Sequence, residues 1–409
     1  MIYTAIMGHG TVGSGVAEIL INKRKMISKQ IQNDIEVKYI LDLRSFDNLP
    51  YSDKFTKDFN VIINDPDISI VVEVMGGVTF AYDYVKQCLT AGKSVVTSNK
   101  ELVAEKGAEL IEIAKEKNVN FLFEASVGGG IPILRPLVQC LAANSINEIT
   151  GILNGTTNYI LNKMIVDNMD FDSALNLAKE KGFAERNPAA DIEGHDACRK
   201  ICILASLGFG KHVYPEQVKT EGITRVTLDD VDYADKFNCV IKLIGQAKRL
   251  KDGKITATVR PTVVSRECML SNVDGVFNAI TVNGDATGDV MFYGKGAGKM
   301  PTASAVVADV IDCAKHIDAR KYLFWEDGYD GYVTDNTEDD IKLYVYAKSN
   351  DYDALVNSFN SIFGADTVNV KNRYNNELVF ITDFGKENDL INNINALNAD
   401  EVKIMHTLF

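Results

Sequence analysis

Short apolar runs alternate with amphipathic stretches over the first 125 residues of the chain. The runs are expected to be strands, and they cover residues 2–7, 37–41, 61–63, 70–74, 94–97 and 120–124. Between them, the spacing of apolar residues predicts helices over residues 16–20, 82–90 and 102–116. Because the runs are apolar nearly throughout, as in strands covered on both faces, the alternation predicts an α/β fold with a parallel, helix-covered sheet.

This alternation stops at residues 127–132, which contain three consecutive glycines. Farther along, helical patterns at 171–182 and 195–208 mix with strand-like patterns at 255–264 and 276–282. We therefore expect a second, α+β domain over residues 131–299. A helix over residues 301–316 is expected to pack back on the first domain, which then comprises residues 1–130 together with about 300–318.

An acidic segment separates this part of the chain from a third pattern. Seven of the sixteen residues from 325 to 340 are Asp or Glu, which predicts a solvated linker over residues 319–340. The following patterns predict strands at 341–347, 367–373, 378–382 and 402–407 and helices at 353–363 and 388–397. Their order, βαββαβ, predicts a ferredoxin-like module over residues 341–409 that either binds a small effector or serves in dimerisation.

Composition places the chain among globular proteins, with 46% hydrophobic and 24% charged residues. The formal charge of −13 argues against nucleic acid and anionic membrane surfaces as partners. No apolar run approaches the ~20 residues of a membrane span, and no signal-type segment is present, so we expect a cytoplasmic protein. The seven cysteines form no CxxC pair, and buried thiols explain Cys198 and Cys202 near His195 more simply than a metal does.

The first apolar run ends in a glycine-rich turn, GHGTVG, that opens the first helix. Gly8 lets the chain leave the strand in a tight turn, and Gly10 lets the backbone approach a pyrophosphate. Gly13 lets the helix pack close to the strand, and the helix N-terminus offers N–H groups to the phosphates. The turn therefore predicts a dinucleotide site on a Rossmann-type sheet.

The end of the second predicted strand carries two opposing indications about the cofactor. Asp42 is placed to accept hydrogen bonds from the adenosine ribose of NAD, whereas Arg44 is suited to the additional phosphate of NADP. The strand-end acid favours NAD. A strand-end Asp that merely caps a turn is the alternative.

Two lysines are candidates for supplying a proton to a carbonyl oxygen during hydride transfer. Lys100 follows a parallel strand at its carboxyl end, where open sheets bind their ligands. Lys200 lies four residues after Asp196 on a predicted helix, so the two side chains share a face. From the spacing alone, a surface salt bridge is the favoured interpretation of this pair.

Six segments, in family order, resemble homoserine dehydrogenase of the monofunctional type with a C-terminal ACT-like domain. They are GHGTVG (8–13), SNK (98–100), FEASVGGGIPI (123–133), GILNGTTNYI (151–160), KGFAERNPAADIEGHDACRK (181–200) and GKGAGKMPTASAVVADV (294–310). The resemblance spans essentially the whole chain. It implies NAD(P)-dependent interconversion of L-homoserine and L-aspartate 4-semialdehyde, in threonine and methionine biosynthesis, with residues 131–299 serving substrate binding and dimerisation.

The resemblance also implies roles for individual residues. Lys100 and Lys200 match two active-site lysines, one of which protonates the aldehyde oxygen, while Asp196 orients Lys200 or a water molecule. The implied substrate-binding residues are Glu185, Asp191, Gly155 and Thr156. The implied cofactor-binding residues are Gly8, Gly10, Thr11, Val12, Gly13, Asp42, Arg44, Gly76, Lys100, Gly296 and Gly298.

A monovalent cation, Na⁺ or K⁺, is implied at Glu124, Val127, Gly129 and Ile131, mostly through backbone carbonyl groups. A flexible hinge at residues 128–130 is the alternative. Two positions depart from the family pattern: Leu41 stands where a basic residue often assists NADP, and residues 349–354 lack the glycine of an ACT effector loop.

Other functions remain open at this point. One is a dehydrogenase of the same fold acting on another amino-acid aldehyde or oxo acid, and another is a catalytically silent nucleotide or amino-acid sensor. The expected partners are a small-molecule substrate and further copies of the chain, in a homodimer or homotetramer, because both later domains offer sheet edges.

Overall fold

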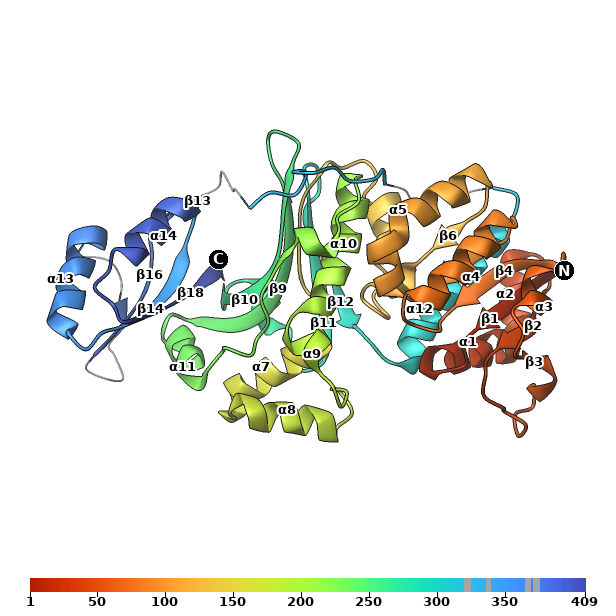
Figure 1. The fold of residues 1–409 in the computed structure, drawn as a ribbon, viewed down its shortest axis with the longest axis horizontal. Coiled ribbons are helices and arrows are strands. Elements are labelled where there is room, and N and C mark those ends of the chain that lie inside the picture. The colour runs from red at the N-terminus through yellow and green to blue at the C-terminus, as the bar shows by residue number, and fades with distance from the viewer. Residues whose placement is uncertain (320–324, 336–339, 365–368, 371–375) are drawn as a thin grey trace. The chain divides into compact units, whose positions relative to one another are not determined.

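A computed structural model describes residues 1–319, 325–335, 340–364, 369–370 and 376–409 of the chain. The chain forms two compact units, and each is built from three segments (Figure 1). The first unit comprises Met1–Ile149, Arg199–Val218 and Asn278–Asp330. The second comprises Thr150–Cys198, Lys219–Phe277 and Gly331–Phe409.

A six-stranded parallel sheet forms the centre of the first unit, in the order β3-β2-β1-β4-β5-β6. Its strands are β1 (Ile2–Met7), β2 (Ile35–Leu41), β3 (Phe55–Thr56), β4 (Ile68–Glu73), β5 (Ser94–Thr97) and β6 (Phe121–Leu122). This is the strand order of a Rossmann fold, and it reverses between β1 and β4. The predicted parallel sheet is thus confirmed, and ligands of such sheets bind at the carboxyl ends of the strands beside this reversal.

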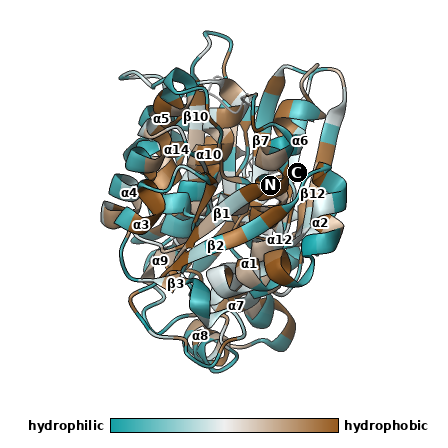
Figure 2. Ribbon diagram, turned by 90° about the vertical axis from the view of Figure 1, so that its right-hand side faces the viewer, coloured by the Kyte–Doolittle hydropathy of each residue, from teal (hydrophilic) through white to brown (hydrophobic). Residues whose placement is uncertain are grey.

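Helices cover this sheet with their apolar residues turned inward. They are α1 (Thr11–Asn22), α2 (Arg24–Ile31), α3 (Asn60–Ile63), α4 (Thr79–Thr90), α5 (Lys100–Glu116) and α12 (Lys299–Lys315). Figure 2 shows hydrophilic and hydrophobic residues next to each other along the helices, as expected for amphipathic segments. The expected return of residues 301–316 is confirmed, since α12 packs on α1, where a Cβ on Gly15 would lie 2.9 Å from the Ala303 Cβ.

The predicted strand at residues 61–63 is wrong, because these residues belong to the helix α3. The carboxylate of Asp58 accepts a hydrogen bond from the backbone N–H of Asn60 at 2.9 Å and so starts the helical turn. Only Ile62 of this helix is buried, and the sheet edge is taken by β3. Three β-branched residues are too short a run to decide between strand and helix.

The remainder of the first unit carries α6 (Leu134–Gln139) and β12 (Gly288–Lys295), while β7 (Ile146–Ile152) and β11 (Phe277–Gly284) each include residues of both units. In the second unit, β9 (Cys239–Arg249) and β10 (Ile255–Ser265) pair antiparallel along their whole length. The short β8 (Lys219–Thr220) joins β10, and the helices are α7 (Gly155–Asp167), α8 (Phe171–Glu180), α9 (Ala189–Ile192) and α11 (Leu228–Lys236). Helix α10 (His195–Phe209) begins in the second unit and ends in the first.

The ferredoxin-like module lies at the end of the chain, in the second unit. Its elements are β14 (Leu343–Lys348), α13 (Tyr352–Phe363), β15 (Asn369–Val370), β16 (Glu377–Ile381), α14 (Glu387–Asn395) and β18 (Glu401–Leu408). The strand order β18-β14-β16-β15 and the buried faces of α13 and α14 confirm the predicted βαββαβ arrangement. The two-residue strands β13 (Asp340–Ile341) and β17 (Gly385–Lys386) pair separately, and most of the strand predicted at 367–373 lies outside the described residues.

The acidic segment is exposed at most of its described residues, as expected of a solvated linker, but Trp325 and Tyr332 anchor it. Trp325 is 3% exposed, and its indole N–H donates to Nδ1 of the buried His212 at 2.7 Å. The backbone N–H of Glu326 donates to Gly210 O, and that of Ile255 donates to Tyr332 O. The anchoring was not predicted because the prediction relied on the density of acidic residues. The two aromatic side chains that provide it, Trp325 and Tyr332, are buried.

Candidate active site

The glycine-rich turn has open space at one of its three glycines only. Gly8 has a φ of +101°, which favours glycine, and a Cβ on Gly13 would lie 2.0 Å from Gly8 O. Gly10 directly precedes α1, whose first two residues are Thr11 and Val12. A Cβ on Gly10 would meet nothing within 4 Å. The turn therefore packs α1 against β1 and leaves room at the helix N-terminus, which fits the pyrophosphate of a dinucleotide.

Asp42, directly after β2, has a carboxylate that already accepts four hydrogen bonds. The donors are the backbone N–H of His9 at 2.8 Å and three groups of Arg44: its backbone N–H, Nε and Nη2. The hydrogen bond from Arg44 holds the pKa of Asp42 well below its usual range. Asp42 is therefore an anion at neutral pH, and the side chain of Arg44 is 62% exposed and open to other partners.

A buried carboxyl group that the sequence analysis missed shapes the loops after β4 and β5. Glu73 accepts hydrogen bonds from Met75 N at 2.8 Å and from Thr97 Oγ1 at 2.5 Å, and burial raises its pKa. Asn99 donates from its backbone to Thr97 Oγ1 and from its side chain to Gly77 O. These bonds connect the Gly76 loop to the start of α5, where Lys100 is the first residue. The signal for Glu73 was an acid inside the apolar run IVVEV.

A salt bridge brings the two lysine-bearing segments together. Glu101, next to Lys100, accepts from Nη2 of Arg199, next to Lys200, at 2.6 Å. Lys200 is 8% exposed, and Lys100 is intermediate. Asp196 is one helical turn before Lys200 on α10 and is 6% exposed. The two lysines thus share one region of the first unit, although they are far apart in sequence.

In the second unit, one amide holds two carboxylates. Nδ2 of Asn154 donates to Asp191 Oδ1 and to Asp196 Oδ2, both at 2.7 Å, while its Oδ1 caps α7 at Thr157 N. Both carboxylates therefore lie close to the same nitrogen, and the concentrated negative charge suits an ammonium group. The sequence analysis named Gly155, the first residue of α7, but missed the capping Asn154 before it.

The structure does not bring Glu185 into this pair of acids. Glu185 is exposed on the segment after α8, and within the described ranges no hydrogen bond or ion pair joins it to another residue. Thr156 Oγ1 donates to Phe183 O at 2.8 Å and so connects the start of α7 to that same segment.

In the segment expected to hold a cation, the carboxylate of Glu124 already accepts hydrogen bonds on both of its oxygens. Glu124 accepts three backbone N–H groups, from Ile133, Leu134 and Arg135, at 2.6–2.9 Å. Across the described part of the chain, no three His, Cys, Asp or Glu side chains group to hold a metal. A cation there would be held by backbone carbonyl groups, such as those of Val127, Gly129 and Ile131.

The two glycine-rich loops of the first unit touch each other. A Cβ on Gly129, whose φ is +54°, would lie 2.4 Å from Gly296 O. Gly298, with a φ of +125°, precedes the first turn of α12. Residues 128–130 therefore pack closely against the Gly296 loop, and this close approach explains a glycine at position 129 without a flexible hinge.

Comparison with known proteins agrees with this arrangement. The family model "Homoserine dehydrogenase, NAD binding domain" matches residues 8–124, and the model "Homoserine dehydrogenase" matches residues 132–311. A homoserine dehydrogenase of Synechocystis sp. is 47% identical over 315 residues, which are 75% of this chain and 72% of that protein.

Solved structures extend the similarity to the whole chain. A homoserine dehydrogenase from Thiobacillus denitrificans superposes with a TM-score of 0.89 at 33% identity and covers 99% of this chain and 98% of its own. A hyperthermophilic archaeal homoserine dehydrogenase in complex with NADPH has a TM-score of 0.64 at 31% identity over 76% of this chain and 97% of its own. In the described residues, no helix is long and apolar enough to cross a bilayer. With both family models matched in order, an NAD(P)-binding turn and two adjoining lysine segments, the chain belongs to the homoserine dehydrogenase family of oxidoreductases.

Proposed function

We propose that Lys200 is the proton donor when this homoserine dehydrogenase converts L-aspartate 4-semialdehyde to L-homoserine. The observation that carries the proposal is the Glu101–Arg199 salt bridge, which joins the segment of Lys100 to the segment of Lys200. The nicotinamide cofactor, when bound, supplies the hydride to the aldehyde carbon. Lys200 gives its ammonium proton to the aldehyde oxygen, and in the reverse direction its neutral amine takes that proton from the hydroxyl group of homoserine.

The more buried of the two lysines is the better candidate for this transfer. Lys200 is 8% exposed, so water competes little for its proton. Lys100 begins α5 and is assigned the role of fixing the oxygen by its positive charge. Asp196, one turn before Lys200, orients the lysine or a water molecule.

The substrate ammonium group is assigned to the acids of the second unit. Asp191 and Asp196 both bond to Asn154, so their negative charge is held in one place by α7. Gly155 and Thr156 complete this loop, and Glu185, exposed in the described structure, joins the ammonium only when substrate is bound. An aldehyde or oxo acid that lacks the ammonium group is expected to be a poor substrate.

NAD is the proposed preferred cofactor, with NADP as a second one. Asp42 suits a ribose hydroxyl group once the exposed guanidinium group of Arg44 turns away from it, and Leu41 adds no further cation. The archaeal relative in complex with NADPH indicates that this family's fold accepts the additional phosphate. Arg44 is the residue of this chain that is suited to meet it.

Further assignments follow from the family. A monovalent cation, Na⁺ or K⁺, is assigned to the backbone carbonyl groups of Glu124, Val127, Gly129 and Ile131. Residues 341–409 are assigned as an ACT-like regulatory or dimerising domain, residues 131–299 as the substrate-binding and dimerisation domain, and the protein as a cytoplasmic homodimer or homotetramer.

The test is oxidation of homoserine, followed by nicotinamide absorbance with NAD⁺ and with NADP⁺, in K⁺, Na⁺ and choline salts. Lys200→Met is expected to lower kcat by about 10²- to 10⁴-fold, the usual size of a general acid–base contribution, with cofactor affinity nearly unchanged. Lys211→Met, which removes a surface lysine paired with Glu326, is the matched control and is expected to keep full activity. A Lys200→Met enzyme with unchanged kcat would exclude the proposed donor.

A further inference from the structure

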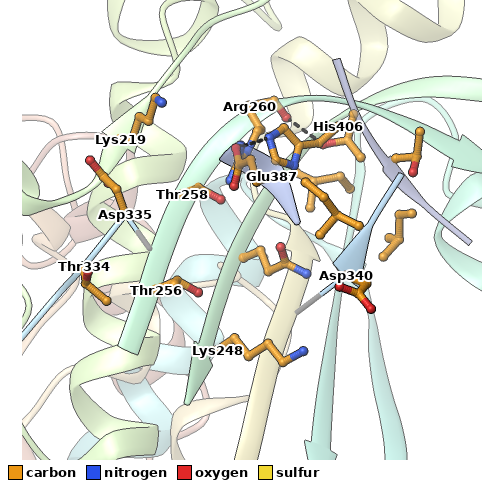
Figure 3. Close-up of a pocket in the computed structure, with 16 residues that line it drawn as sticks. Lys219, Lys248, Thr256, Thr258, Arg260, Thr334, Asp335, Asp340, Glu387 and His406 are labelled. Atoms are coloured by element: carbon orange, nitrogen blue, oxygen red, sulfur yellow. Dashed lines mark hydrogen bonds and ion pairs between the residues drawn. The ribbon is translucent and has the colours of Figure 1, made fainter. Parts of the chain in front are cut away.

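A polar cavity of about 170 Å³ lies in the second unit, apart from all the residues assigned above (Figure 3). One wall is the hairpin of β9 and β10. Alternate residues of β10 face the cavity, and their antiparallel partners on β9 continue the same face. These residues are Thr256, Thr258, Arg260 and Thr262 on β10, with Ile244, Gln246 and Lys248 on β9.

The ferredoxin-like module extends this wall through β18, which pairs with β10, and adds the first residue of α14 to the lining. His406 of β18 is paired in register with Thr262, and its Nε2 bonds to Oε1 of Glu387, the first residue of α14, at 2.9 Å. Asp335 and Asp340 line the cavity from the segment that leads into the module. The site therefore joins three parts of the second unit that are separated in the sequence.

Arg260 is the unusual residue of this cavity. Its side chain is 20% exposed, and its one ion pair in the described structure is to Glu387 Oε1, at 3.8 Å, too long for a hydrogen bond. Glu387 is already committed to His406. Figure 3 shows the guanidinium group beside these two side chains, with the threonines of β10 along the same strand. A guanidinium group has five N–H donors, and none of them donates to an acceptor within the described ranges.

A largely desolvated guanidinium group without hydrogen bonds from the protein gains from a ligand that supplies acceptors. Burial also lowers the pKa of Arg260, in the direction expected for a partly desolvated cation. The planar fork of an arginine matches the paired oxygens of a carboxylate or phosphate. Lys219 and Lys248 add positive charge to the same lining.

The acids limit what else the ligand can carry. Among the described lining residues, Asp335, Asp340 and Glu387 balance Arg260, Lys219 and Lys248, so these side chains together carry no net positive charge when His406 is neutral. A second anionic group would meet these carboxylates and be repelled. Hydroxyl groups on the ligand would instead find acceptors in the acids and threonines.

We propose that this cavity binds a small monoanionic metabolite, whose single carboxylate group pairs with Arg260 and whose remaining part carries hydrogen-bonding hydroxyl groups. The site is independent of the dehydrogenase reaction, because none of its lining residues is assigned to cofactor or substrate. Binding fills the space between the β9–β10 hairpin and the start of α14. It therefore stabilises the attachment of the ferredoxin-like module within the second unit.

The test is calorimetric titration of the full chain with lactate, inorganic phosphate and succinate. Lactate represents the hydroxylated monocarboxylate, whereas phosphate, largely doubly charged at neutral pH, and succinate represent dianions that the acids should reject. We expect lactate to bind, and phosphate and succinate to bind at least about tenfold more weakly. Arg260→Gln should weaken binding by about tenfold or more, the usual effect of losing a charge-assisted hydrogen bond, and Arg260→Lys should restore part of it.

Arg266→Gln is the matched control, because this arginine pairs with Asp235 on the surface outside the cavity. It should leave the affinity unchanged, and both glutamine variants should oxidise homoserine at the parental rate. If Arg260→Gln does not fold, Lys219→Gln, at the edge of the cavity, tests the same lining and should weaken binding. Absence of lactate binding up to about 10 mM overturns the proposal, as does lactate binding that persists in Arg260→Gln, or phosphate or succinate that binds as tightly as lactate.

Discussion

Gly10 and Gly13 of the nucleotide turn are expected to respond differently to replacement by alanine. Gly13→Ala should lower stability, whereas Gly10→Ala should weaken cofactor binding. In Gly13→Ala, the new Cβ would lie 2.0 Å from Gly8 O, whereas ordinary contacts begin at 3.4 Å. The obstacle is backbone and cannot rotate away, so α1 must move from β1 by roughly 1 Å. That movement loosens the packing of Val16, Ala17 and Leu20, which are on the buried face of α1.

The expected loss of stability follows from two opposing terms. Overpacking against a fixed obstacle costs about 3 kcal/mol, and the better helix propensity of alanine returns about 1 kcal/mol. Gly13→Ala should therefore lose about 2 kcal/mol, which lowers Tm by about 4–8 °C in a domain of this size. In Gly10→Ala the Cβ meets nothing within 4 Å and φ is −78°, so stability should change by less than about 0.5 kcal/mol.

Cofactor binding separates the two variants further. The methyl group of Gly10→Ala occupies the space where the pyrophosphate approaches the helix N-terminus, so the Kd for the dinucleotide should rise at least about tenfold. The assays are thermal unfolding without cofactor and calorimetric titration with NAD⁺ and NADP⁺. A Gly10→Ala protein that binds normally, or a Gly13→Ala protein with the parental Tm, would refute this account of the turn.

Three further outcomes are expected from single substitutions. Arg44→Ala should raise the ratio of kcat/KM for NAD⁺ to that for NADP⁺, since it frees Asp42 and removes the cation suited to a phosphate; an unchanged ratio would contradict the assignment. Arg199→Gln breaks the 2.6 Å bridge to Glu101 and should lower kcat by about ten- to a hundredfold through misplacement of the lysines, with partial rescue by Arg199→Lys and an unaltered Kd for cofactor. Burial raises the pKa of Asp309 to about 7 despite its bond to Arg135. Between about pH 4 and pH 7 the folded state therefore keeps a proton on Asp309 that the unfolded state, with a pKa of 3.8, has already lost. Stability should therefore fall from about pH 4 to pH 7, and Asp309→Asn should remove that decline in urea unfolding measured across this range; an equal decline in both proteins would show that Asp309 is ionised throughout.

The parts of the fold that could be predicted are those with a local signal. Apolar runs and glycines placed β1, β4, β5 and their helices, because burial on both faces leaves a pattern within each strand. The order βαββαβ was also sufficient for the ferredoxin-like module. The strand predicted at residues 61–63 was wrong because three apolar residues are too few to show either a strand or a helix periodicity.

The parts that could not be predicted depend on contacts between distant segments. The sequence around Glu101 does not indicate that it pairs with Arg199. The sequence around Asn154 likewise does not indicate that its side-chain amide donates to Asp191 and Asp196. Motif spacing identified the residues on either side of each contact but not the contact itself. The cavity around Arg260 likewise exists only because β10 and the module meet.

The anchoring of the acidic segment has a practical consequence for spectroscopy. Trp325 is the single tryptophan of the chain, so all indole fluorescence comes from one buried side chain. Its ring packs edge-on to Phe123 at 5.5 Å and donates to His212, both of which belong to the first unit. The emission of the intact enzyme is thus a built-in optical reporter of that one docking point. A red shift, or quenching by iodide, would record release of the segment without any added label.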